Sequence, residues 1–188
     1  MLGLGSSIMK GGIDPLTLWG TYTSDFSSGV DSWQASSVES SSSDLTLSSA
    51  TGPDGESGWL KGVYSANQTD ALSGIVYIGL WSGNISGNNM SDAKRIEISA
   101  KIYLENDWDG SDAVTTFFHP GASANASQSV NYNTEVAQDT ITTISGTVDV
   151  SDSSNSNATA FITWRAANDA PQNGAIFWFK TIVFKIYG

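Results

Sequence analysis

The last fifteen residues, GAIFWFKTIVFKIYG, limit the possible folds more than any other part of the chain. Phe177 and Phe179 alternate with Trp178, and after Lys180 and Thr181 the alternation resumes in a shifted phase. A break of phase within a run of aromatic and β-branched residues indicates a β-bulge in a strand rather than a helix. Because the run is apolar on nearly both faces, it is predicted to be a central strand of an all-β sandwich.

Strand patterns recur along the rest of the chain. The clearest one is Lys94–Leu104, in which Ile96, Ile98, Ala100, Ile102 and Leu104 alternate with mostly polar residues. Further strands are expected at Trp19–Tyr22, Leu45–Leu47, Ser57–Ala66, Ser73–Trp81, Val114–Phe118, Val130–Val136, Thr140–Val150 and Ala158–Ala166, with a Gly/Asn loop at Ser82–Ser91. No span of twelve residues has a helical stripe. About ten short strands at this spacing predict a jelly-roll β-sandwich over residues 16–188.

An apolar but glycine-rich segment, residues 1–15, precedes this domain. Burial of its large apolar side chains would contribute roughly 9–18 kcal/mol, whereas ordering its backbone costs roughly 14–28 kcal/mol. The segment is therefore predicted to be an extended N-terminal arm that becomes ordered by β-addition to a partner chain. The alternative is a tail that rests on its own domain. The expected partner contacts are Leu2, Leu4, Ile8, Met9 and Ile13.

Composition excludes several functions. The net charge is −11 and Lys and Arg number only eight, so no basic stripe is present for nucleic acid or an anionic membrane. The absence of Cys excludes disulfides. No apolar run approaches the roughly 20 residues of a membrane span. Met1–Gly12 lacks the order of a signal peptide, so synthesis in the cytoplasm without export is expected.

A catalytic site is difficult to assemble from this sequence. His119 is the only histidine, and no Ser occupies a G-x-S-x-G elbow. One His and no Cys cannot bind zinc without several carboxylates. Asp107 and Asp109 lie two residues apart in a loop-like segment, whereas the paired carboxylates of glycosidases usually come from separate strands. The chain is therefore predicted not to be an enzyme.

The same acidic segment is the best candidate for a cation site. Asp107, Asp109 and Asp112 flank a glycine, and closely spaced carboxylates of this kind suit calcium. A solvated hairpin tip explains these residues equally well. Calcium is thus the one cofactor considered, and no other is expected.

Two tryptophans are candidate platforms for sugar rings. Trp81 lies near Asn84, and Trp108 lies beside Asp109, so an aromatic face and hydroxyl-binding groups occur together in loops. Tryptophans in loops also often plug the end of a sandwich. The other candidates, Trp33, Trp59, Trp164 and Trp178, lie in strand-like runs and are expected in the core.

Three motifs carry a family resemblance. They are DFSSGVDSW (Asp25–Trp33), SGWLKG (Ser57–Gly62) and FWFKTIVF (Phe177–Phe184). Over roughly Tyr22 to Gly188, the chain resembles the galactose-binding-like jelly rolls, which include many carbohydrate-binding modules. The resemblance implies a structural role for the segment around Trp33.

The same resemblance implies a structural calcium ion held partly by an acidic residue in the middle of the last strand. Lys180 and Thr181 stand there in this chain, which departs from the pattern. The arm also resembles the start of small virion proteins of tailed phages.

Three function classes follow. The first is a non-catalytic virion structural protein, a capsid decoration or a tail or fibre subunit. Its arm would bind other virion proteins or copies of itself, and its loops could contact host glycan. The alternative is a stand-alone carbohydrate-binding module, and a glycan-cleaving enzyme is third. The apolar arm, the missing signal peptide and the missing catalytic groups favour the first class.

Deletion of Met1–Gly12 separates the first two classes. A virion subunit should still fold but should fail to oligomerise or to enter a particle, because its anchor is gone. A free binding module should bind sugar with unchanged affinity. Size-exclusion chromatography with light scattering, together with a glycan array, measures both properties.

Overall fold

The computed structural model describes residues 15–37, 44–67, 72–82, 84–89, 92–105, 113–119, 129–149, 157–165 and 172–188. The strands are β1 (Leu18–Ser24), β2 (Gln34–Ser37), β3 (Leu45–Ala50), β4 (Trp59–Tyr64), β5 (Leu72–Ser82), β6 (Asn84–Ile85), β7 (Asn88–Asn89), β8 (Arg95–Leu104), β9 (Ala113–His119), β10 (Ser129–Glu135), β11 (Thr142–Asp149), β12 (Asn157–Arg165) and β13 (Ile176–Tyr187). In β9, β10, β12 and all of β5 except Ile75, the description covers the backbone and its pairing. The described ranges contain no α-helix, and so no helix that could span a membrane.

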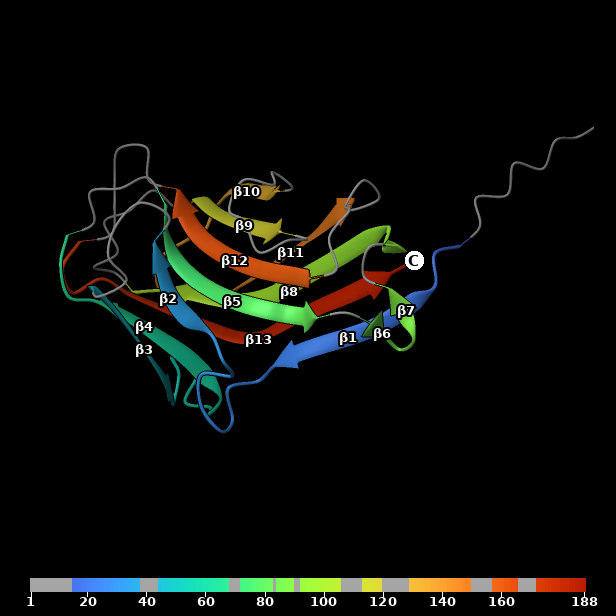
Figure 1. Ribbon diagram of the computed structural model, residues 1–188. Helices are drawn as coiled ribbons and strands as arrows, with labels where there is room; N and C mark the ends of the chain where they lie inside the picture. Colours follow the sequence, from blue (N-terminus) through green and yellow to red (C-terminus); the bar gives the residue numbers. More distant parts are fainter. Residues whose placement is uncertain are drawn as a thin grey trace, which may run out of the picture.

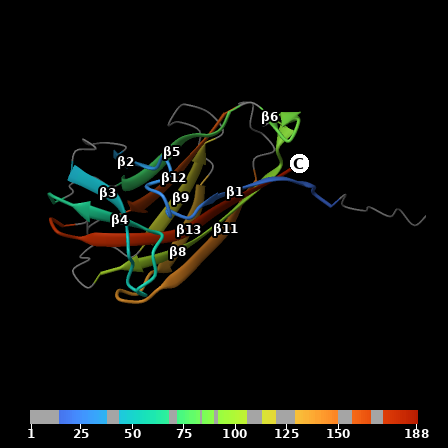
Figure 2. The same cartoon turned by 90° about the horizontal axis from the view of Figure 1, so that it is seen from below.

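Two antiparallel sheets face each other. Sheet A has the order β11-β8-β13-β4-β3, with β1 also paired to β13. Sheet B has the order β10-β9-β12-β5-β2, and β6 and β7 form a separate hairpin. Figures 1 and 2 show the two layers, with β8 and β13 in one and β5 and β12 in the other. The chain is therefore an all-β jelly-roll sandwich, as the strand spacing predicted.

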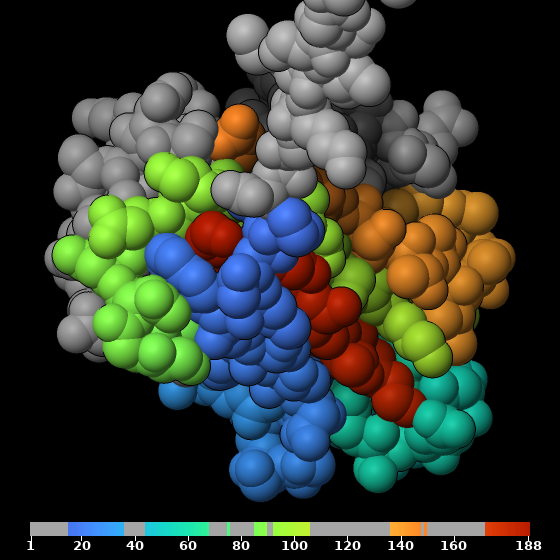
Figure 3. Space-filling model, turned by 90° about the vertical axis from the view of Figure 1, so that its right-hand side faces the viewer, coloured from blue at the N-terminus to red at the C-terminus, as the bar shows by residue number. Residues whose placement is uncertain are grey.

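The C-terminal strand β13 is central in sheet A. It pairs with β8 along one edge, whereas its other edge pairs first with β4 and then with β1. Figure 3 shows the second of these pairings, with β1 (blue) beside β13 (red). The register with β8 shifts between Lys180 and Val183, and Thr181 has a φ of 53°. This irregularity is the β-bulge that the break of phase predicted.

The bulge keeps both halves of β13 directed into the core. Phe177 and Phe179 are fully buried before it, and Ile182, Phe184 and Ile186 are fully buried after it. The Phe177 and Phe179 rings meet edge to face at 5.6 Å between centroids, and Trp33 stacks on Phe184 at 6.3 Å. Such aromatic pairs contribute about 0.5–1.5 kcal/mol each beyond their burial.

The loop after β1 supports the structural role that the resemblance implied for Trp33. The Trp33 indole Nε1 donates to Ser24 Oγ at 2.8 Å within the core. The Asp31 carboxylate accepts from the Phe26 amide at 2.9 Å, and Phe26 is fully buried although its φ is 55°. The aromatic residues of this motif therefore serve packing rather than ligand binding.

Sequence patterns located most strands to within two residues. The alternation in Lys94–Leu104 is confirmed, because all five of its apolar residues are buried in β8. The loop prediction for Ser82–Ser91 was wrong in part, since β6 and β7 form a short hairpin there. Ser86 and Gly87 both have positive φ (50° and 84°), which makes the tight turn that such a hairpin needs.

Gly62 of β4 lies opposite Phe177, and a Cβ atom at this glycine would lie 2.1 Å from Cζ of the Phe177 ring. Gly62→Ala should therefore lower the free energy of unfolding by about 1–3 kcal/mol through overpacking, measured by urea denaturation. As a control, Ile141→Ala, at a side chain that is 40% exposed, should change stability by about 0.5 kcal/mol or less. Equal stability of Gly62→Ala and wild type would contradict the packing described.

Candidate functional site

Most residues singled out in the sequence lie outside the described part of the chain. These are the arm residues Leu2, Leu4, Ile8, Met9 and Ile13, the acidic residues Asp107, Asp109 and Asp112, and Trp108. Their proposed roles in partner, metal and sugar binding stay predictions. Of the sugar-binding set, the backbone of Trp81 and of Asn84 is described.

Trp81 and Asn84 lie at the same end of the sandwich. Trp81 is near the end of β5 and pairs with Ala158, and Asn84 opens the β6–β7 hairpin opposite Asn89. The hairpin is seated against β1, because Ile85 is buried and a Cβ atom on Gly20 would lie 2.8 Å from it. Figure 1 shows β6 and β7 near the C-terminus, beyond the end of β5. Trp81 and Asn84 are thus three residues apart in the chain but belong to different strands, β5 and β6.

Sheet B brings together residues that the sequence analysis did not connect. Its register forms one row across all five strands, Gln34–Val76–Phe161–Phe117–Ser129. An adjacent row is polar, Ser36–Gly74–Thr163–Thr115–Asn131. Two phenylalanine positions therefore pair at the middle of the sheet, next to a line of hydroxyl and amide residues.

Strand alternation assigns both rows to the outer face of sheet B. Ile75 is fully buried in the core, and Ala35, its partner on β2, packs against the core. Gln34 and Val76, one position away on each strand, belong to the opposite face, and the Gln34 side chain is exposed. We name the set Gln34, Val76, Phe161, Phe117 and Ser129 the outer row of sheet B. Aromatic positions beside hydroxyl and amide residues suit a flat ligand with apolar faces and polar edges.

His119 ends β9, where its backbone pairs with that of Thr159. Among the described residues, no group of three His, Asp or Glu side chains could hold a metal ion.

Two of the expected core tryptophans are buried in an unexpected place. Trp59 is 0% exposed and Trp178 is 7% exposed, so their predicted burial is confirmed, yet neither belongs to the core cluster between the sheets. They lie on the outer face of sheet A, where Lys180 covers the Trp59 ring at 5.5 Å and Lys61 covers the Trp178 ring at 4.9 Å. Both rings are thereby closed to a sugar.

The indole nitrogen of each of these two tryptophans donates a hydrogen bond to a carboxylate. The Trp59 Nε1 donates to Asp54 Oδ1 at 2.8 Å, and the Trp178 Nε1 donates to Glu105 Oε1 at 2.9 Å. Each tryptophan is therefore held by a hydrogen bond to a carboxylate and by a cation–π contact with a lysine.

Lys180 occupies the position at which the resemblance implied an acidic calcium ligand. Its ammonium contacts the Glu56 carboxylate and lies 3.5 Å from Asp54 Oδ2. The hydrogen bond with Glu56 raises the pKa of Lys180, although burial opposes it. At this point of the sandwich a lysine cation lies between the two carboxylates.

Burial alone would raise the pKa of Asp54. Hydrogen bonds from the Glu56 amide and the Trp59 indole, together with the Lys180 charge, outweigh this effect and hold the pKa of Asp54 below its ordinary value of 3.8. The ionised form of Asp54 therefore stabilises the folded state.

Comparisons with known proteins identify the fold. No protein-family model matches the sequence, and no curated protein is significantly similar to it. Among solved structures, the CBM22-1 xylan-binding domain of Xyn10C from Paenibacillus barcinonensis has a TM-score of 0.53 at 13% identity, and the match covers 91% of this chain and 95% of that one. The xylan-binding module CBM15 has a TM-score of 0.53 at 13% identity, with 89% and 96% covered.

An enzyme structure also matches. The arabinose-bound α-L-arabinofuranosidase MgGH51 has a TM-score of 0.58 at 14% identity over 82% of this chain, which spans 23% of the length of the enzyme. At these identities the likeness is one of fold. The jelly roll is thus shared with carbohydrate-binding modules and with part of a larger enzyme.

The Asp54 contacts predict a specific pH dependence. Because the pKa of Asp54 is lowered in the folded state, its contribution to stability is present above pH 3.8 and is lost as the pH falls through the folded-state pKa. Asp54→Asn keeps an oxygen acceptor but cannot ionise, so this variant should lose less stability than wild type between about pH 5 and pH 2. Urea midpoints across that range measure the difference.

The exposed Asp92 provides the matched control. Asp92→Asn removes the same formal charge from an exposed position, so it measures the effect of net charge alone. A profile of Asp54→Asn that coincides with that of Asp92→Asn would contradict the ionic role of Asp54.

Proposed function

We propose that the chain is a non-catalytic glycan-binding module whose ligand is a xylan-type polysaccharide. The ligand lies across the outer row of sheet B. The observation that carries the proposal is the cross-strand pairing of Phe117 with Phe161 at the centre of that row.

The outer row has the chemistry that an oligosaccharide requires. A pyranose ring presents C–H groups on its faces and hydroxyls at its edges, so it stacks on aromatic side chains and forms hydrogen bonds at its rim. Phe117 and Phe161 supply the stacking positions, with Val76 beside them, and Gln34 and Ser129 supply polar groups at the two ends. Five strands spaced about 4.8 Å apart give a surface about 19 Å long, which suits several sugar units.

The solved structures support a binding role over a catalytic one. Two xylan-binding modules match this chain over nearly their whole length, whereas the arabinofuranosidase match covers 23% of that enzyme. Trp81 lies six residues after the core residue Ile75, and its partner Ala158 lies three residues before Phe161, so strand alternation does not assign Trp81 to the outer row.

The virion role that the sequence analysis favoured has less support than this alternative. Its main argument is the N-terminal arm, which lies outside the described residues. The xylan-binding modules and the arabinofuranosidase reported above do not bear on a virion, whereas the two modules bear directly on glycan binding.

The proposal is tested by titrating the protein with xylohexaose in a calorimeter. Phe117→Ala and Phe161→Ala should each weaken binding about five- to thirtyfold, because each removes one aromatic contact worth about 1–2 kcal/mol. Leu18→Ala, at a residue on β1 that is 49% exposed, should leave affinity unchanged. No heat of binding to xylohexaose, or equal affinity of all four proteins, would overturn the proposal.

A matched assay addresses the ends of the surface and catalysis. On a glycan array, Gln34→Ala, at the β2 end of the outer row, should reduce the signal for long oligosaccharides more than for short ones. Incubation of the wild-type protein with xylan should release no reducing ends, and steady release would refute the non-catalytic role.

A further inference from the structure

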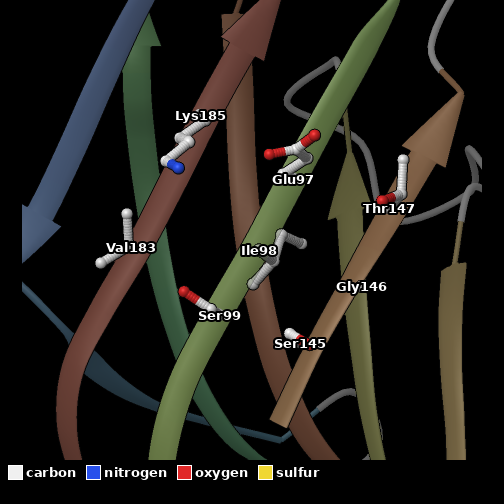
Figure 4. A pocket seen from close by; sticks show the side chains of 8 residues that line it. All are labelled: Glu97, Ile98, Ser99, Ser145, Gly146, Thr147, Val183 and Lys185. Carbon is white, nitrogen blue, oxygen red and sulfur yellow. The ribbon is translucent and has the colours of Figure 1, made fainter.

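A polar hollow lies on the outer face of sheet A, on the opposite side of the molecule from the outer row of sheet B. Its volume is about 310 Å³, at the lower end of the range of ligand pockets. The lining residues come from three neighbouring strands, β8, β11 and β13, as Figure 4 shows: Glu97, Ile98, Ser99, Ser145, Gly146, Thr147, Val183 and Lys185.

Short side chains on paired strands create this hollow. Ser145 pairs with Ser99, and Ser99 pairs with Val183, so three small residues lie in a line across the sheet. In the next line Thr147 pairs with Glu97, and Glu97 pairs with Lys185. The hollow therefore has a floor lined by hydroxyls and one wall that carries charges.

The acidic group of this wall is already fully engaged. Glu97 Oε2 accepts from the Tyr187 hydroxyl at 2.8 Å, and Glu97 Oε1 lies 3.2 Å from Arg95 Nη2. The Arg95 guanidinium stacks on the Tyr187 ring at 4.4 Å, so the three side chains fix one another. Asp149, another nearby acid, lies opposite Arg95 in the backbone register of β11 and β8 and does not line the hollow.

The cationic group of the wall is Lys185. Lys185 is exposed, and among the described residues no carboxylate forms an ion pair with its ammonium. By contrast, Lys180, on the same strand as Lys185, contacts the carboxylates of Asp54 and Glu56. An ammonium with three donors next to serine and threonine hydroxyls is a suitable receptor for a carboxylate.

We infer that the hollow binds the carboxylate and adjacent hydroxyls of a uronic acid unit. Lys185 Nζ donates to the carboxylate, and Ser99, Ser145 and Thr147 form hydrogen bonds with the ring hydroxyls. The volume admits one sugar ring, so the site binds a side group or a chain end of a polysaccharide rather than its backbone. This inference rests on the proposed glycan-binding function and adds a second, charge-selective contact on the other sheet.

The test is a titration of the full chain with sodium glucuronate, followed by ¹⁵N–¹H NMR. Amides of β8, β11 and β13 around Ser99 and Ser145 should shift, and Lys185→Ala should weaken the response roughly tenfold, as expected for the loss of one charge-assisted hydrogen bond. Lys185→Arg should retain binding. The matched control is Lys101→Ala, which removes an exposed lysine from β8 outside the hollow and should have no effect.

Neutral glucose and sodium acetate complete the design. Glucose should cause no shift at these amides, and acetate should bind more weakly than glucuronate. The inference is overturned if glucuronate causes no shift, if Lys185→Ala leaves the shifts unchanged, or if acetate and glucuronate act equally. Xylohexaose binding by the same samples reports separately on sheet B, so a loss of one function is distinguishable from a loss of the other.

Discussion

The structure depends on the packing of β13 into the core along its whole length. Five of its apolar side chains are completely buried, and they belong to two alternation phases joined by the bulge at Lys180 and Thr181. Without the bulge, one half of the strand would turn its aromatic residues outwards. With it, one strand supplies the core and still pairs with β8, β4 and β1.

The same bulge determines the chemistry of the outer face of sheet A. It places Lys180 over Trp59 and between the carboxylates of Asp54 and Glu56, while Lys61 covers Trp178. This half of the face is closed by intramolecular contacts. The other half, beyond the bulge, carries short side chains and Lys185, which forms no ion pair within the described part of the chain, and the hollow is open there. Sheet B has a different surface, with phenylalanine positions at its centre.

The sequence predicted the fold because alternation and phase are local properties. The strand β8, the bulge in β13 and the central place of that strand follow from patterns of a few residues. The outer row of sheet B could not be predicted in the same way. Phe117 and Phe161 lie in segments recognised as strands, but their pairing depends on a register between strands 44 residues apart in the chain. Only a fold can supply that register.

Burial of tryptophans illustrates the same limit. Their place in strand-like runs indicated that Trp59 and Trp178 are buried, yet it could not show that lysines and a loop cover them on the outer face. Likewise, Lys180 was recognised as a departure from a calcium pattern, but its partners Asp54 and Glu56 are more than 120 residues away in sequence. Contacts between distant residues arise from the fold and leave no trace in local composition.

A crystal structure of the protein with xylohexaose tests the central claim most directly. The account predicts sugar rings stacked over Phe117 and Phe161 on the outer face of sheet B, with Gln34 near one end of the ligand. Sugar bound only at another surface, or crystals grown with xylohexaose in excess that contain no sugar, would contradict it.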